Sequence, residues 1–253
     1  MAFRKLLILP KASNKNIAYS AYRMTNYFKN TVNGVYECNT HEILYNHKND
    51  SDYHKDVYDK IINYNNINKN YKYLCFGGDQ SISIGSTLAS INKDTEINTG
   101  VLWIDSKKNI NDSNILSDRS LSYILGKESF DWTSNINHLN INDLYYWGLK
   151  EKNKNTIQNI DDIAYFLSKY NNFHISIDIN SIDIYDDESY DNNNPYAINV
   201  NDLAFFIRRL GYIKDKKYSI DLTEYIPDNK TNFNNYIFKW NMLKYIMSSI
   251  NTN

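Results

Sequence analysis

The stretch that decides the fold is Phe76-Gly77-Gly78-Asp79-Gln80-Ser81-Ile82-Ser83-Ile84-Gly85. An apolar run at 73–76 leads into the Gly-Gly-Asp turn, and a helical pattern begins at Ser81. Asp79 in the turn is expected to accept hydrogen bonds from the backbone donors that open this helix. Three later blocks, 103–111, 176–183 and 219–227, repeat the pattern of an apolar strand that ends in acidic residues.

Short apolar runs alternate with segments of helical period along the whole chain, which predicts a parallel sheet covered by helices on both faces. The predicted strands are 6–9, 73–76, 101–105, 144–149, 173–178 and 218–222. The predicted helices are 16–28, 53–64, 81–91, 119–125, 156–170, 201–210 and 233–250. This pattern favours one three-layer α/β/α domain spanning residues 1–253. In such sheets ligands bind beyond the carboxyl ends of the strands, and all four acidic blocks fall there.

Composition excludes several classes of function. A net charge of -1 gives no electrostatic reason to expect nucleic acid, and no apolar run approaches the ~20 residues of a membrane span. Two cysteines, Cys38 and Cys75, form no disulfide framework and no metal spacing, which favours a reducing intracellular compartment, the cytoplasm first, with an organelle or a virion as alternatives. Abundant Asn, Lys, Ile and Tyr with few Gly and Pro are typical of an AT-rich genome, as in some viruses, parasites and organelles.

The histidines do not form a metal motif. His41, His47 and His54 are six and seven residues apart in polar sequence, which predicts surface histidines rather than a zinc site. His174, at the start of a strand, is expected to be a packed or edge residue.

The four blocks, in this order and spacing, resemble the motifs of the arginase/agmatinase (ureohydrolase) family. The resemblance covers residues 70–250, and the first 70 residues match weakly. It implies an arginase-like fold. It also implies a site where two Mn²⁺ ions deprotonate a shared water, which attacks the guanidinium carbon of the substrate.

The resemblance also implies which positions would hold the metals. The family's ligand positions carry two aspartates, two asparagines, a glutamine and a lysine here: Gln80, Asp105, Lys107, Asn109, Asp178 and Asn180. Two carboxylates and an ammonium cannot balance two divalent cations, and an ammonium has no lone pair to donate. A two-metal centre is therefore not expected. The alternative is one weakly held ion, through Asp105, Asp178, Asn180 and Gln80.

Three other positions bear on the site that the resemblance implies. The ammonium of Lys107 could occupy the vacated metal position and pair with Asp105 and Asp178, or it could turn into solvent. Ser117 falls where the family carries a proton-shuttling histidine. Glu224 matches the acidic residue that contacts the substrate guanidinium, so it is a candidate remnant of a guanidinium-binding pocket.

The sequence thus favours a non-catalytic arginase-like protein that has lost its dimanganese site. Such a protein would serve as a structural or binding component. Because members of the family usually form oligomers, the resemblance implies protein partners or self-association. No catalytic residue and no cofactor are expected in this interpretation. The alternative is a divergent Mn²⁺-dependent hydrolase of a guanidino or amide substrate.

Overall fold

The computed structural model describes residues 5–9, 39–42, 49–67, 73–110, 113–151, 154–183, 198–213 and 215–224. Its centre is an eight-stranded sheet in the order β2-β1-β3-β10-β7-β4-β5-β6, and every neighbouring pair is parallel. The strands are β1 Lys5–Leu9, β2 Asn39–Glu42, β3 Tyr73–Gly77, β4 Thr99–Ile104, β5 Leu144–Trp147, β6 Thr156–Ile157, β7 Asn172–Asp178 and β10 Lys217–Thr223. Two short strands, β8 Ile182–Asp183 and β9 Ile198–Asn199, pair separately.

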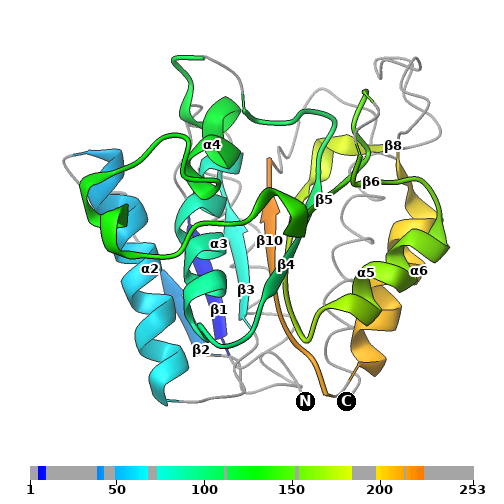
Figure 1. Ribbon diagram of the computed structural model, residues 1–253, viewed down its shortest axis with the longest axis horizontal. Coiled ribbons are helices and arrows are strands. Elements are labelled where there is room, and N and C mark those ends of the chain that lie inside the picture. The colour runs from blue at the N-terminus through cyan, green and yellow to red at the C-terminus, as the bar shows by residue number, and fades with distance from the viewer. Residues whose placement is uncertain are drawn as a thin grey trace.

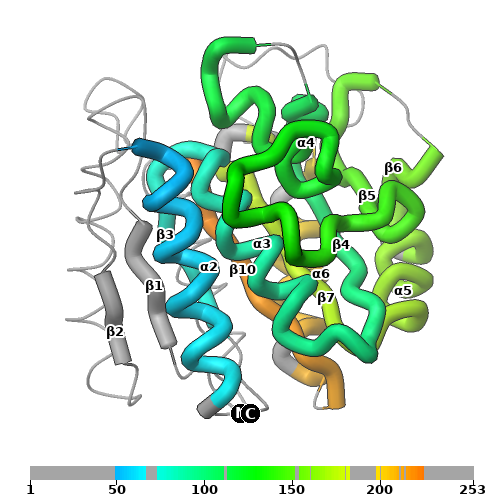
Figure 2. The backbone as a smooth tube through the Cα atoms, turned by 60° about the vertical axis from the view of Figure 1, so that its left-hand side comes forward, coloured from blue at the N-terminus to red at the C-terminus, as the bar shows by residue number. Residues whose placement is uncertain are grey.

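Helices cover both faces of the sheet (Figure 1). One layer contains α2 Asp50–Ile67, α3 Ser83–Asn92 and α4 Ser120–Ile124, and the other contains α5 Ile160–Lys169 and α6 Val200–Tyr212. Figure 2 shows α2 beside β3, where Tyr53, Val57 and Ile61 pack against Tyr73 and Cys75. The predicted three-layer α/β/α architecture with a parallel sheet is confirmed.

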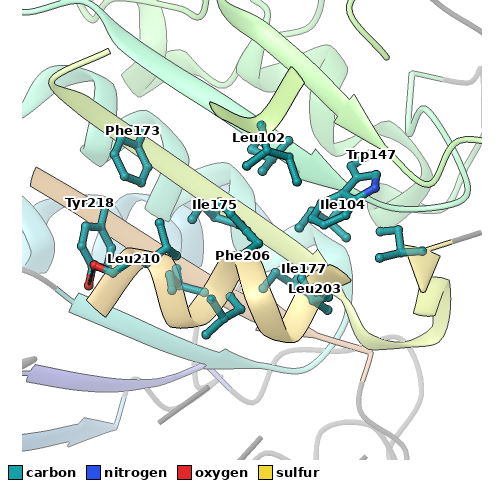
Figure 3. Close-up of a cluster of buried hydrophobic side chains, with 14 of the residues drawn as sticks. Leu102, Ile104, Trp147, Phe173, Ile175, Ile177, Leu203, Phe206, Leu210 and Tyr218 are labelled. Carbon is teal, nitrogen blue, oxygen red and sulfur yellow. Dashed lines mark hydrogen bonds between the residues drawn. The ribbon is translucent and has the colours of Figure 1, made fainter. Parts of the chain in front are cut away.

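The two faces of the central strands differ in chemistry. On β7, Phe173, Ile175 and Ile177 point into an apolar core under α5 and α6, together with Leu203 and Phe206 of α6 (Figure 3). Each such side chain contributes about 1.5–3 kcal/mol when it leaves water. Because side chains alternate along a strand, the residues between them face α3 instead.

The face toward α3 is a buried polar layer. His174 donates to or accepts from Ser219 Oγ through Nδ1 at 2.8 Å, and its Nε2 lies 3.0 Å from Asp221 Oδ2. The hydroxyl of Ser86, on α3, donates to the same Asp221 oxygen. Both side chains of the His174–Asp221 pair are fully buried, so this pair joins β7 and β10 inside the protein.

Two details of the predicted elements are wrong. The helix predicted at 156–170 begins at Ile160, because Asn159 caps it by accepting from the backbone N–H groups of Asp161 and Asp162. Residues 156 and 157 form β6 instead. The strand β2 carries no apolar pattern and was not predicted. The predicted helices 16–28 and 233–250 lie outside the described residues.

The surface position predicted for His54 is also wrong. His54 is fully buried, with its ring stacked on Phe130 at 5.7 Å between centroids. It lies on α2, and the segment after α4 brings Phe130 over it. Polar neighbours in the sequence do not reveal this contact, because the covering ring comes from a residue 76 positions further along the chain. No helix in the described part of the chain is long and apolar enough to cross a membrane.

Candidate functional site

A cavity of about 370 Å³ lies at the carboxyl ends of the central strands. The structure brings together at this cavity the residues that the sequence places in four separate blocks. Its walls are formed by Gln80, Asp105, Ser106, Lys107, Asn109, Ile115, Ser117, Asp118, Asp178 and Glu224. The side chain of Asn180 lies outside the described residues. Ser106, Ile115 and Asp118 were not predicted, although Asp118 directly follows Ser117.

Gln80 reaches the cavity through the turn after β3. Asp79 accepts a hydrogen bond from the backbone N–H of Ser81 at 3.0 Å, as predicted, and so starts the following 3-10 turn. The Gln80 side chain is only 2% exposed. Its Nε2 donates to Ser176 Oγ at 2.7 Å, and its Oε1 accepts from the hydroxyl of Thr223. Both ends of the carboxamide are therefore engaged by the neighbouring strands β7 and β10.

Asp105 follows β4 and is held by the loop that comes after it. Its Oδ1 accepts from the backbone N–H of Lys107 at 2.9 Å, and its Oδ2 accepts from Asn109 Nδ2 at 2.8 Å. Asn109 has a φ of 51°, a left-handed conformation that asparagine tolerates better than most residues. Burial raises the pKa of Asp105 to about 6, against the hydrogen bonds that favour its ionised form.

Lys107 does not lie between the two aspartates. Its side chain is 65% exposed, and its Nζ lies 3.8 Å from Asp118 Oδ1. The hypothesis of an ammonium paired with Asp105 and Asp178 is therefore wrong, and the solvent-facing alternative agrees with the structure. The cause is local: the backbone N–H of Lys107 turns inward to Asp105, which directs the side chain outward.

Glu224 closes the other side of the cavity, directly after β10. It has a φ of 58°, and its backbone N–H donates to the Gly78 carbonyl at 2.8 Å. Its Oε1 accepts from the backbone N–H of Gln80 at 3.2 Å. Burial raises the pKa of Glu224 to about 7, and the nearby Asp79 carboxylate raises it further while the Gln80 N–H opposes the shift.

Glu224→Gln is expected to raise the melting temperature (Tm) at pH 8 and to leave it nearly unchanged near pH 4. A carboxyl group whose pKa is raised by folding binds its proton more tightly in the folded chain. Its destabilising effect therefore grows as the pH rises from the unfolded pKa, about 4.3, to the folded value of about 7. The variant keeps an oxygen for the Gln80 N–H but does not titrate. Calorimetry from pH 4 to 8 measures the difference.

Glu96→Gln is the matched control, because Glu96 is exposed and makes no contact of this kind. Its Tm is expected to follow the wild type at every pH. A constant difference between Glu224→Gln and the wild type across the pH range would contradict the assigned pKa.

The residues of the cavity do not fit a two-metal centre. Among the described residues, no group of three or more His, Cys, Asp or Glu side chains could hold a metal ion. The two oxygens of Asp105 and both ends of the Gln80 amide already bond to protein atoms. Asn and Gln oxygens are weak ligands compared with carboxylates, and the Lys107 ammonium is no ligand at all.

Comparison with solved structures identifies the architecture. A scan of protein-family models and a search of curated proteins find no match. The arginase of Entamoeba histolytica, solved with L-ornithine, has a TM-score of 0.77 at 20% identity, with 99% of each chain covered. The arginase of Bacillus subtilis has a TM-score of 0.72 at 17% identity, covering 96% of this chain and 97% of its own.

A third similar structure is that of a protein named for an activity other than that of arginase. The formimidoylglutamase of Bacillus subtilis has a TM-score of 0.69 at 13% identity, covering 98% of this chain and 86% of its own. Identities this low show the fold and leave the reaction open. The chain therefore has the arginase-like ureohydrolase fold that the order of its four motifs predicts.

Proposed function

We propose that this chain is a non-catalytic protein with a ureohydrolase fold, kept as a structural or binding component. The proposal rests on how the side chains of Gln80, Asp105 and Asn109 are hydrogen-bonded in the cavity. Their polar atoms bond to one another or to the strands beside them. A hydrolase of this kind needs lone pairs directed at a metal and a bound water, whereas the oxygens of Asp105 and Gln80 accept hydrogen bonds from protein donors.

The proposed role of the scaffold is to associate with copies of itself or with a protein partner. Support comes from large hydrophobic side chains on the outer layer: Tyr165 of α5 is 59% exposed, and Phe205 and Tyr212 of α6 are 46% and 64% exposed. Exposed aromatic residues are enriched in protein interfaces. No cofactor is part of this proposal.

A divergent metal-dependent hydrolase is the second candidate. It is favoured by the persistence of the cavity and by the four carboxylates in its walls, from Asp105, Asp118, Asp178 and Glu224. Such a wall could bind a guanidino group or an amide, and two of its carboxylates, Asp105 and Asp178, could hold one Mn²⁺ weakly. In this case Asp178, which is only partly buried, would be a direct contact of the substrate or the ion.

Assays with arginine and agmatine separate the two candidates. The chain is incubated with each compound in the presence of Mn²⁺, and urea release is measured beside light scattering after size-exclusion chromatography. The proposal predicts no urea above the rate of buffer with Mn²⁺, and a mass above that of one chain or a stable partner complex. Urea release that is lost in Asp178→Asn would establish the hydrolase instead.

A further inference from the structure

The carboxamide of Gln80 bonds to two strands, and the backbone of Gln80 follows a third. Gln80 follows β3 through the Gly77–Asp79 turn, its Nε2 donates to Ser176 of β7, and its Oε1 accepts from Thr223, the last residue of β10. All three side chains are buried, with exposed fractions of 2% or less. In the sheet, β10 lies between β3 and β7, so the amide spans the central strand from one neighbour to the other.

The backbone around Gln80 makes two more connections across the same ends. The Gln80 N–H donates to Glu224 Oε1, and the Glu224 N–H donates to the Gly78 carbonyl. Thus the turn after β3 and the residue after β10 are bonded in both directions. Ser83, at the start of α3, adds a bond of 2.9 Å to Ser176.

Gln80 stands at a position that carries a metal ligand in the family that the chain resembles. The resemblance to the ureohydrolases puts a metal-ligating histidine there, where a bound metal would tie the strand ends together. Glutamine has no imidazole, but its amide offers a donor at one end and an acceptor at the other. We propose that Gln80 is a clasp that joins the carboxyl ends of β3, β7 and β10 by hydrogen bonds, in the place of a metal.

The clasp does not depend on what the chain does in the cell. A buried donor or acceptor that loses its partner is costly, because no water replaces the lost bond. The single hydroxyl proton of Thr223 can turn to the Ile177 carbonyl, 3.2 Å away, when Gln80 does not accept it, and Ser176 bonds to Ser83, so each partner has one other bond available. The contribution of the clasp is therefore expected to appear both as a loss of stability when Gln80 is replaced and as a coupling between Gln80 and its partners.

Gln80→Met tests the clasp, because methionine has a similar length and no hydrogen-bonding amide. Two lost buried bonds are expected to lower the Tm by about 5 °C. Gln158→Met, at an exposed glutamine, is the matched control and is expected to leave the Tm within about 1 °C. A Gln80→Met loss no larger than that of the control would overturn the proposal.

A double-mutant cycle with Thr223→Val isolates the bond between the two side chains. Thr223→Val alone also removes the bond to the Ile177 carbonyl, and the cycle cancels that effect. The loss in the double variant is expected to be smaller than the sum of the single losses. Strict additivity would contradict the clasp. If Gln80→Met does not fold, Ser176→Ala is combined with Thr223→Val instead; these two side chains both bond to Gln80, so the clasp again predicts a double loss smaller than the sum.

Hydrogen exchange distinguishes a clasp from a general loss of stability. In Gln80→Met, amides at 78–81, 177–179 and 222–224 are expected to exchange at least tenfold faster than in the wild type, under conditions where the protein stays folded. Amides of α5 are expected to keep their wild-type rates. A uniform change over both regions, or none, would overturn the proposal.

Discussion

Asp221→Ala is expected to cost about 3–5 kcal/mol of unfolding free energy, more than the loss expected for Gln80→Met. Asp221 is fully buried, lies 3.0 Å from His174 Nε2 and accepts a hydrogen bond from Ser86. Alanine leaves these two groups without their carboxylate in a region that water does not reach. The Tm is expected to fall by on the order of 10 °C, measured by calorimetry or by circular dichroism at pH 7.

The matched control is Asp215→Ala, because Asp215 is exposed on the turn before β10. Its Tm is expected to stay within about 1 °C of the wild type. If Asp221→Ala fails to accumulate as a folded protein, Asp221→Asn keeps the shape of the side chain and can be compared instead. A loss in Asp221→Asn as small as that of the control would show that the buried pair contributes little.

Asn109→Asp is expected to produce a strong, pH-dependent loss of stability. The amide of Asn109 donates to Asp105 Oδ2 at 2.8 Å, and both residues are nearly fully buried. A second carboxylate at this distance cannot be ionised beside the first, so one of the pair is forced to keep its proton. Folding then raises the pKa of the pair, and the penalty grows as the pH rises above about 3.9, the unfolded value.

The expected result is a Tm close to that of the wild type near pH 4 and several degrees lower at pH 8. Asn135→Asp, at an exposed position, controls for the added charge and is expected to follow the wild type. The substitution also restores a carboxylate at a position where the resemblance expects a metal ligand. Mn²⁺ at about 1 mM is therefore expected to recover part of the loss at pH 8 in this variant alone. A pH-independent difference would contradict the geometry of the Asp105–Asn109 bond.

The fold could be predicted because its strongest signals are local. Four apolar strands, each followed by polar or acidic residues, fix the direction of the sheet and place their ends at one edge. The motif order then brings Gln80, Asp105, Asp178 and Glu224 to one cavity, where the structure has them. Asp79 as a cap also follows from its own neighbours alone.

What could not be predicted depends on contacts between distant segments. The burial of His54 requires Phe130, and the pair of His174 with Asp221 requires β7 and β10 to be neighbours although 47 residues separate the two side chains. The direction of Lys107 depends on which of its groups, the backbone N–H or the ammonium, reaches Asp105. Its sequence position permits either, and the structure uses the N–H.

The metal content of the purified protein tests most directly whether the cavity has lost the dimanganese centre. Protein prepared with Mn²⁺ present is dialysed and measured by elemental analysis, and its Tm is compared with and without a chelator. Because the side chains of Gln80, Asp105 and Asn109 already form hydrogen bonds within the protein, we expect far less than one Mn²⁺ per chain and a Tm that the chelator does not change. About two Mn²⁺ per chain, with a Tm that falls when the chelator is added, would contradict the account and restore a hydrolase.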